Sequence, residues 1–352
     1  MKEVKSIRCS LNPVIKQLNE AKSKRWLVTG AAGFIGSHLV EVLLELEQHV
    51  VGLDNLSTGN KDNLVEVQKN VGNDKWGRFK FIEGDILDLE CCQQACNGVD
   101  FVLHQAALGS VPRSLADPLA TNSANVTGFL NVITVAKNLG VSRVVYASSS
   151  SVYGSHEALP KKEENIGGAL SPYALSKRVN ELYAGVFKKC YDLSLVGLRY
   201  FNVFGPRQDP HGQYAAVIPK WISAIIKNQE VQIFGDGETT RDFCYVKNVV
   251  QANILSALGE FEGEKGAIMN VAVSEQISLS KLYELIREIV AHRITIGEKL
   301  IKKLPERDGD IKQSLADISL IRGQIGYKPE FNLQDGLEKT VDWHLKKNDK
   351  ER

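Results

Sequence analysis

The sequence is poor in the features that mark several protein classes. Six cysteines among 352 residues are too few for a disulfide scaffold. The 43 Lys and Arg residues nearly balance the 42 Asp and Glu residues, which gives a net charge of +1 and no basic surface for nucleic acid or an anionic membrane. No apolar stretch reaches the roughly 18 residues of a membrane-spanning helix. We therefore expect a cytoplasmic protein that binds neither nucleic acid nor membrane.

The cysteines and histidines, which could bind a metal ion, also lack the spacing of a metal site. Cys91, Cys92 and Cys96 form a cluster, but no second pair of ligands follows at the spacing of a zinc site. The seven histidines are scattered, and no two lie four residues apart. We expect no bound metal.

What is present in the first half is a repeating rhythm of strands and helices. Apolar runs of strand length alternate with amphipathic helical stretches such as Phe34–Leu46 and Leu119–Leu139. The predicted strands are Arg25–Thr29, Val50–Asp54, Phe79–Glu83, Val99–His104, Arg143–Ala147 and Leu195–Tyr200. Strands that are apolar throughout are typical of a parallel sheet buried on both faces. The pattern predicts an α/β fold with a doubly wound parallel sheet.

The rhythm ends near Tyr200, where glycine and proline become frequent. Shorter elements then follow without regular alternation, and we expect a smaller α/β domain. The predicted strands there are Val231–Phe234 and Met269–Val273, and the predicted helices are Leu279–Ala291 and Leu333–His344. We therefore divide the chain into an arm (1–24), a first domain (25–200) and a second domain (201–352). The alternative that some later segments return to the first domain stays open.

A glycine motif follows the first predicted strand. Gly30 permits a tight turn, Gly33 lets the backbone approach a pyrophosphate, and Gly36 permits close packing of the next helix. The helix N-terminus then favours the diphosphate. Asp54 ends the second strand, where a carboxylate accepts hydrogen bonds from ribose hydroxyls and repels a 2′-phosphate. Because no Arg or Lys lies between Asp54 and Lys61, the motif predicts NAD rather than NADP in a Rossmann-type domain.

A second motif supplies groups for acid–base chemistry. Tyr173 and Lys177 lie four residues apart, hence on one face of a helix that Pro172 is suited to begin. A nearby ammonium lowers the pKa of a phenol, whose ordinary value of about 10 is too high for a base at neutral pH. The hydroxyls of Ser148–Ser151 follow the fifth strand, at the sheet edge where α/β folds bind ligands.

Together these motifs resemble the extended short-chain dehydrogenase/reductase family. The resemblance covers about 25–344. Its motifs are the glycine turn, Asp54, Gly84–Ile86, His104–Ala107, Ser148–Gly154, Tyr173 with Lys177, Arg199–Pro206 and Arg241–Phe243. Within this family the chain looks like the nucleotide-sugar 4-epimerases. It is most similar to bacterial UDP-N-acetylglucosamine 4-epimerases, which supply sugars for surface polysaccharide.

The resemblance implies roles for individual residues. Tyr173 would remove the proton of the sugar 4-hydroxyl, Lys177 would lower the Tyr pKa, and Ser149 would bond the same hydroxyl. Tightly bound NAD would be held by Gly30, Gly33, Phe34, Ile35, Gly36, Asp54, Asn55, Asp85, Ile86, Gln105, Ala106, Ala107, Asn125, Tyr173, Lys177 and Tyr200. The UDP-sugar would be held by Gly109, Ser110, Ser149, Ser150, Ser151, Asn202, Val217, Phe234, Arg241, Arg307, Asp310 and Ser314.

Three positions narrow the activity that the resemblance implies. Ser150 and Ser151 stand where sugar-nucleotide dehydratases carry an Asp-Glu pair, so the acid and base needed to eliminate water are missing. Ser314 stands where epimerases restricted to glucose and galactose carry Tyr, and its small size leaves room for a 2-acetamido group. We expect epimerisation of UDP-N-acetylglucosamine and related N-acetylated UDP-hexoses.

Other activities remain as alternatives. One is a UDP-galactose or UDP-glucuronate 4-epimerase, and another, of a different class, is a non-catalytic regulator that binds NAD(H) or a nucleotide sugar. Family resemblance also implies a homodimer formed through the predicted helices Leu119–Leu139 and Pro172–Tyr191.

Overall fold

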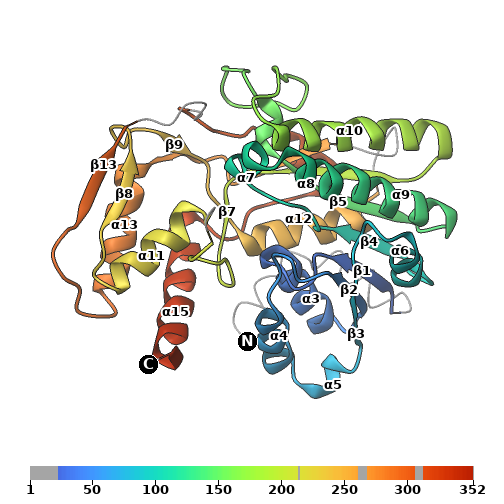
Figure 1. Cartoon of the computed structure of the whole chain (residues 1–352), viewed down its shortest axis with the longest axis horizontal. Helices are drawn as coiled ribbons and strands as arrows, with labels where there is room; N and C mark the ends of the chain where they lie inside the picture. The colour runs from blue at the N-terminus through green and yellow to red at the C-terminus, as the bar shows by residue number, and fades with distance from the viewer. Residues whose placement is uncertain (1–22, 213–214, 261–267, 306–311, 352) are drawn as a thin grey trace.

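The computed structural model describes residues 23–212, 215–260, 268–305 and 312–351 (Figure 1). Most of the predicted arm therefore lies outside the described residues. A seven-stranded sheet with strand order β11-β6-β5-β4-β1-β2-β3 forms the centre of the fold, and every pairing in it is parallel. Its strands are β1 (Arg25–Thr29), β2 (His49–Asp54), β3 (Phe79–Glu83), β4 (Phe101–His104), β5 (Arg143–Ser149), β6 (Leu195–Tyr200) and β11 (Ile268–Val271). The predicted doubly wound parallel sheet is confirmed.

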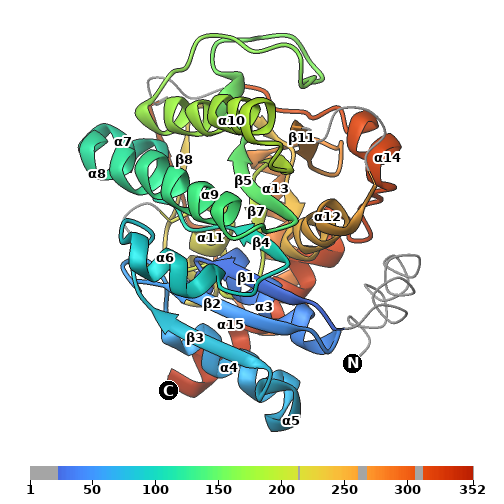
Figure 2. The ribbon, with the colours of Figure 1, turned by 90° about the vertical axis from the view of Figure 1, so that its right-hand side faces the viewer.

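Helices cover both faces of this sheet (Figure 2). Side chains of successive strand residues point to opposite faces: Trp26 and Val28 of β1 belong to one apolar core, and Leu27 belongs to the other. The first core is covered by α3 (Phe34–Glu45), α4 (Lys61–Val71) and α12 (Val246–Leu258). The second is covered by α6 (Leu89–Cys96), α9 (Gly128–Asn138) and α10 (Pro172–Tyr191). Burial on both faces explains why these strands are apolar throughout.

The long helix predicted at Leu119–Leu139 is interrupted by a π-helical turn. The structure has α8 (Pro118–Asn122), then the π-helical segment Ser123–Thr127, then α9. Such turns are rare inside helices and frequently mark functional sites. Shorter helices elsewhere in this part of the chain are α5 (Asn73–Trp76), α7 (Val111–Ala116) and the 3-10 turn Ser150–Tyr153.

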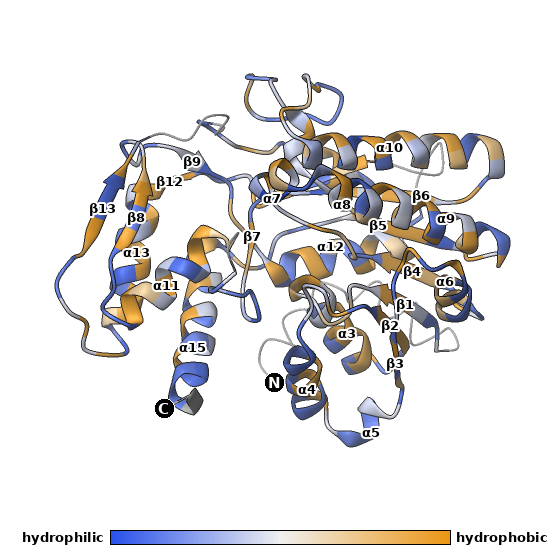
Figure 3. Ribbon diagram, viewed as in Figure 1, coloured by the Kyte–Doolittle hydropathy of each residue, from blue (hydrophilic) through white to orange (hydrophobic). Residues whose placement is uncertain are grey.

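A second lobe is built from the later segments. Hydrophobic and hydrophilic residues alternate along its helices in Figure 3, and α13 (Leu279–Ala291) buries Leu282, Ile286, Ile289 and Val290. Its other helices are α11 (Val217–Ile226) and α15 (Leu333–Glu351), whereas α14 (Ser319–Ile325) packs against β11 of the central sheet. Its strand pairs are β8 (Val231–Phe234) with β13 (Ile301–Leu304), and β9 (Thr240–Arg241) with β12 (Ile277–Ser278).

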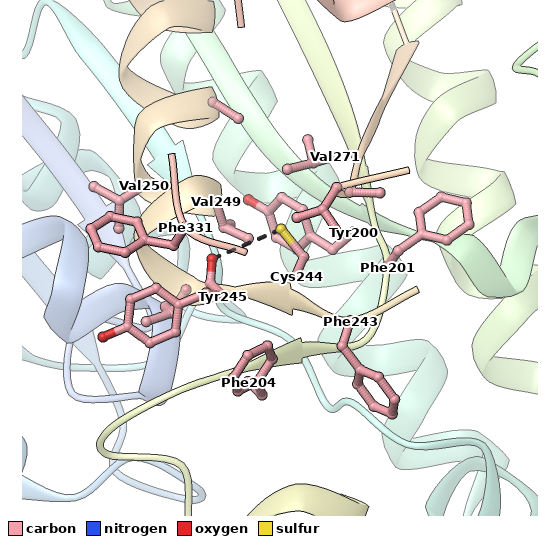
Figure 4. Close-up of a cluster of buried hydrophobic side chains, with 14 of the residues drawn as sticks. Tyr200, Phe201, Phe204, Phe243, Cys244, Tyr245, Val249, Val250, Val271 and Phe331 are labelled. Carbon is pink, nitrogen blue, oxygen red and sulfur yellow. Dashed lines mark hydrogen bonds between the residues drawn. The ribbon is translucent and has the colours of Figure 1, made fainter. Parts of the chain in front are cut away.

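Aromatic packing joins the two lobes next to the end of β6 (Figure 4). The strands β7 (Val203–Phe204) and β10 (Cys244–Tyr245) pair there. The ring of Tyr245 lies 5.7 Å from that of Phe204 and 5.1 Å from that of Phe331. Beyond this join the chain returns to the first lobe, because α12 packs on its core and β11 pairs with β6. The division of the chain at residue 200 stays a prediction.

Candidate active site

A cavity of about 850 Å³ opens at the carboxyl ends of the central strands. Five strands deliver a predicted site residue to it: Gly30 after β1, Asp54 at the end of β2, Gln105 after β4, Ser149 at the end of β5 and Tyr200 at the end of β6. Ligands of open α/β sheets bind at this edge, where the carboxyl ends of parallel strands meet. The cavity is therefore the candidate active site.

The glycine turn between β1 and α3 needs glycine at positions 30 and 36. Gly30 has φ +68°, and a Cβ at Gly36 would lie 1.9 Å from the carbonyl oxygen of Gly30. Helix α3 begins directly at this turn, and Gly33 at its N-cap contributes no side-chain hydrogen bond. The first N–H groups of a helix have no partner within the helix, so this end favours an anion. The turn fits the pyrophosphate of a dinucleotide.

Asp54 lies deeper in the same wall and is held by the backbone. Its carboxylate accepts hydrogen bonds from the N–H of Ala32 at 2.9 Å and of Leu56 at 2.8 Å. Burial raises its pKa, against the effect of these hydrogen bonds. Beside it, Asn55 donates to the carboxylate of Asp85 at 2.7 Å. These groups form a polar end of the cavity suited to an adenosine.

Tyr173, Lys177 and Ser149 also line the cavity. Helix α10 places the first two on one face, and its N-cap Ser171 accepts a hydrogen bond from the N–H of Ala174 at 3.1 Å. Burial raises the pKa of Tyr173, and a hydrogen bond with Ser149 acts against this rise. Burial lowers the pKa of Lys177 to about 8, and its Nζ donates to the carbonyl of Ala147 at 2.9 Å. An ammonium has three donors, so this bond leaves two for a ligand.

Hydrogen bonds also hold the neighbouring residues at the ends of β4, β5 and β6 in place. The hydroxyl of Tyr200 donates to Oε1 of Gln105 at 3.0 Å, and Asn253 bonds both of these residues. On the other side of β5, the hydroxyl of Ser148 donates to Glu181 at 2.7 Å. Glu181 in turn accepts two hydrogen bonds from the buried guanidinium of Arg199, at 2.8 and 2.9 Å. A bidentate pair of this kind is strong and rigid.

Comparison with known proteins decides the family. The model of the NAD dependent epimerase/dehydratase family matches residues 26–272. The chain belongs to this family. Its dependence on NAD agrees with the fit of the glycine turn and Asp54 to a dinucleotide.

Several proteins similar to this chain bear names that refer to a UDP-sugar. A UDP-N-acetylglucosamine 4-epimerase from Methanobrevibacter ruminantium M1, solved with UDP-N-acetylmuramic acid, is 40% identical with a TM-score of 0.84, over 93% of this chain and 100% of that chain. A putative UDP-glucose 4-epimerase from Methanocaldococcus jannaschii is 37% identical over 92% of this chain and 99% of its own length. A mutant UDP-glucuronic acid 4-epimerase from Bacillus cereus, solved with NAD and a fluorinated UDP-glucuronic acid, is 30% identical with a TM-score of 0.81, over 92% and 99% of the two chains.

Most residues predicted to hold NAD in this family enzyme line the one cavity. They are Gly30, Gly33, Phe34, Ile35, Gly36, Asp54, Asn55, Asp85, Ile86, Gln105, Ala106, Ala107, Tyr173, Lys177 and Tyr200. Asn125 is buried in the π-helical turn and does not line it. Instead, Asn125 accepts from the N–H of Leu108 at 2.7 Å and donates to its carbonyl at 3.0 Å, which fixes the loop after β4.

The predicted substrate residues are more dispersed. Gly109, Ser149, Ser150 and Asn202 line the cavity. Ser110, Ser151, Val217, Phe234, Arg241 and Ser314 do not, and Arg307 and Asp310 lie outside the described residues. Arg241 and Ser314 nevertheless come close together, because the N–H of Ser314 donates at 3.2 Å to the carbonyl of Thr240, the residue before Arg241.

Sequence reasoning missed part of the cavity wall. The missed polar and aromatic residues include Ser57, Thr58, Asn60, Asn63, Arg207, Gln208, Asp209, Trp343 and Lys347. Ser57, Thr58 and Asn60 follow Asp54 in a polar turn at the carboxyl end of β2, a place that could have indicated them, and Asn63 lies in the first turn of α4. Trp343 and Lys347 carry no such local signal.

Two further findings concern the described ranges as a whole. Within them, no group of three His, Cys, Asp or Glu residues is arranged to hold a metal ion. None of their helices combines the length and the apolar character needed to cross a bilayer.

Proposed function

We propose that this epimerase-family enzyme interconverts UDP-N-acetylglucosamine and UDP-N-acetylgalactosamine, or related N-acetylated UDP-hexoses, by inverting carbon 4. The observation that carries the proposal is the presence of Tyr173, Lys177 and Ser149 in the cavity that the glycine turn also lines. A base for a sugar hydroxyl and a dinucleotide cradle thus share one site. The coarser assignment, a UDP-sugar 4-epimerase, is supported by the family and by its relatives.

The side chains of the site are suited to moving one proton reversibly. NAD, when bound, supplies the hydride chemistry at carbon 4 that forms a 4-keto sugar and reverses it on the other face. The phenolate oxygen of Tyr173 takes the 4-hydroxyl proton and, as a phenol, later returns it. The ammonium of Lys177 stabilises the phenolate, and Ser149 adds a hydrogen bond. Ser149 is itself held, because its hydroxyl oxygen accepts from Oγ of Ser151 at 2.9 Å. No net oxidation occurs, so we propose that NAD stays bound between turnovers.

The choice of an N-acetylated sugar is supported by the small side chain of Ser314, which is buried beside the backbone that leads to Arg241. The Methanobrevibacter relative also bears the name of a UDP-N-acetylglucosamine 4-epimerase. The names of other relatives support the alternatives of UDP-glucose and UDP-glucuronate.

A side-by-side comparison of turnover separates these substrates. The purified enzyme is given UDP-N-acetylglucosamine, UDP-glucose and UDP-glucuronate in separate reactions, and the anomeric proton signals are followed by NMR. We expect the highest kcat/KM for the N-acetylated sugar. Ser314→Tyr should lower that value at least tenfold while UDP-glucose turnover persists. Gln313→Tyr, at an exposed neighbouring position, is the matched control. Equal turnover of the N-acetylated sugar by both variants would contradict the role of Ser314.

A non-catalytic binding role is tested by removing the base. Tyr173→Phe keeps the ring and its packing but removes the oxygen that accepts the proton. We expect epimerisation to fall by at least about a hundredfold, in the range usual for loss of a general acid–base group, while NAD binding persists. Full activity in this variant would contradict the assigned chemistry.

We also propose a homodimer. Leu175, Leu182 and Val186 lie on one face of α10 and are each more than half exposed. Leu119 of α8 is 79% exposed, and α8 lies alongside α10 (Figure 2). An exposed apolar face of this extent on two neighbouring helices is suited to pairing with its copy about a twofold axis.

A further inference from the structure

The C-terminal helix α15 contributes to the wall of the cavity, although it lies far along the sequence from every motif of the site. Trp343 and Lys347 line the cavity, and Nζ of Lys347 lies 5.2 Å from the centroid of the Trp343 ring. The rest of α15 packs against α11 and α13 of the second lobe (Figure 1). One helix of the second lobe therefore forms part of the wall of a cavity whose glycine turn belongs to the first lobe.

Glu66 of α4 joins this helix to the first lobe. The indole Nε1–H of Trp343 donates to Glu66, with both carboxylate oxygens at 3.0 Å. The same carboxylate accepts a hydrogen bond from Nε of Arg207 at 3.1 Å. Nη2 of Arg207 lies 2.5 Å from the carboxylate of Glu41 in α3, the helix that begins at the glycine turn. A continuous chain of hydrogen bonds thus links α3, α4, the loop after β7 and α15.

Glu41, at one end of this chain of hydrogen bonds, is held in its charged form. The side chain of Arg207 is only 2% exposed. Burial acts to raise the pKa of Glu41, but Lys247 and Arg207 outweigh it and hold that pKa at about 2. Glu41 is therefore a carboxylate above about pH 2, and its hydrogen bond with the guanidinium of Arg207 is charge-assisted, which is the strong kind.

One hydrogen-bond donor of Arg207, Nη1, is available to a bound ligand. Its Nη1 is buried and makes no hydrogen bond to any residue of the described ranges, although Arg207 lines the cavity. Buried donors are rarely left without a partner in folded proteins. This donor points to a group that occupies the cavity as the missing partner.

We propose that Arg207, Glu66 and Trp343 form a clasp that slows the release of NAD, by tying α15 to the first lobe along the wall of the cofactor cavity. A ligand that fills the cavity contacts both lobes, and the lobes cannot part at this wall until the Trp343–Glu66 hydrogen bonds break. The clasp deepens the proposed retention of NAD between turnovers and rests on it.

The test replaces one hydrogen bond and measures cofactor release. Trp343→Phe keeps an aromatic ring and removes the Nε1–H donor. Trp221→Phe is the matched control, because its Nε1–H donates at 3.3 Å to the carbonyl of Gln232 and Trp221 does not line the cavity. Each protein is loaded with NAD, and release is followed by exchange against excess fluorescent ethenoadenine NAD. Thermal unfolding of each variant verifies that it is folded.

We expect Trp343→Phe to release NAD about tenfold faster than the wild type, since a hydrogen bond to a charged group is worth about that factor in an equilibrium constant. The control should stay within twofold. Release from Trp343→Phe within twofold of the wild type would overturn the clasp. Glu66→Ala removes the hydrogen bonds to Trp343 and to Arg207, so this variant must release NAD at least as fast as Trp343→Phe. Slower release would also overturn the clasp.

The clasp and the proposed retention can fail separately. If the wild type loses NAD during gel filtration, retention between turnovers is wrong. The clasp then still requires Trp343→Phe to bind NAD about tenfold more weakly than Trp221→Phe in an equilibrium titration, and equal affinity of the two variants would refute it.

Discussion

Acid should lower the free energy of unfolding of this protein because of a buried histidine next to the glycine turn. His104 ends β4, is 2% exposed, and its Nδ1 lies 2.9 Å from the hydroxyl of Thr29, the residue before Gly30. Burial, and after it the positive charge of Lys177, lowers the pKa of His104 from 6.5 to about 3. In the folded protein this histidine is therefore neutral throughout the range from pH 8 to 5.

The sign and the size of the effect follow from this shift. Below pH 6.5 the unfolded chain takes up a proton at His104 and the folded chain does not, so the free energy of unfolding falls as the pH falls. The loss is about 1.4 kcal/mol for each pH unit between the two pKa values. Between pH 8 and pH 5, His104 alone should therefore cost about 2 kcal/mol of stability.

Urea unfolding at pH 8 and pH 5 measures this cost. His104→Asn keeps a polar group toward Thr29 and cannot titrate, so it should lose about 2 kcal/mol less stability than the wild type between the two pH values. The exposed His49→Asn is the control and should behave as the wild type. If His104→Asn loses as much stability on acidification as the wild type does, the neutral buried histidine is not the cause.

Three further outcomes are expected. Gly36→Ala places a methyl group against the backbone oxygen of Gly30 and should cost roughly 3 kcal/mol of stability and abolish NAD occupancy, as read by thermal unfolding and absorbance at 260 nm; a variant that purifies with NAD would contradict the turn geometry. Lys177, with its pKa lowered to about 8, should lose its proton and its support of the phenolate above that pH, so kcat should fall there. Lys177→Arg stays charged and should move this fall beyond pH 9, at lower kcat, and an unmoved alkaline limb would refute the assignment. Leu182→Glu should yield a folded monomer in light scattering, and a persistent dimer would place the interface elsewhere.

The sheet could be predicted from the sequence because its signal is local. The strands Arg25–Thr29, Phe79–Glu83 and Leu195–Tyr200 have the predicted bounds, since continuous apolar runs are what burial on both faces requires. β4 begins at Phe101 rather than at the predicted Val99. The N–H of Val99 bonds the carbonyl of Cys96 in the turn after α6, and apolar character alone does not reveal a turn.

In the candidate site, too, the residues with a local sequence signal could be predicted and the others could not. Gly30, Asp54 and Tyr173 could be expected together, because each stands at the carboxyl end of a predicted strand or on the first turn of a predicted helix. The π-helical turn at Ser123–Thr127 was missed, since it keeps the apolar periodicity of a normal helix nearly intact. Trp343 was missed because its partner Glu66 lies 277 residues earlier in the chain, and no local pattern encodes such a pairing.

The pairing of β11 with the central sheet determines which fragments of the chain could fold on their own. A fragment that ends at residue 200 would carry β6 as an open edge, with its row of unpaired backbone groups, and would expose the core that α12 covers. Such a fragment should aggregate rather than bind dinucleotide as an independent unit. The chain passes from one lobe to the other and back, so the lobes should unfold in a single cooperative transition.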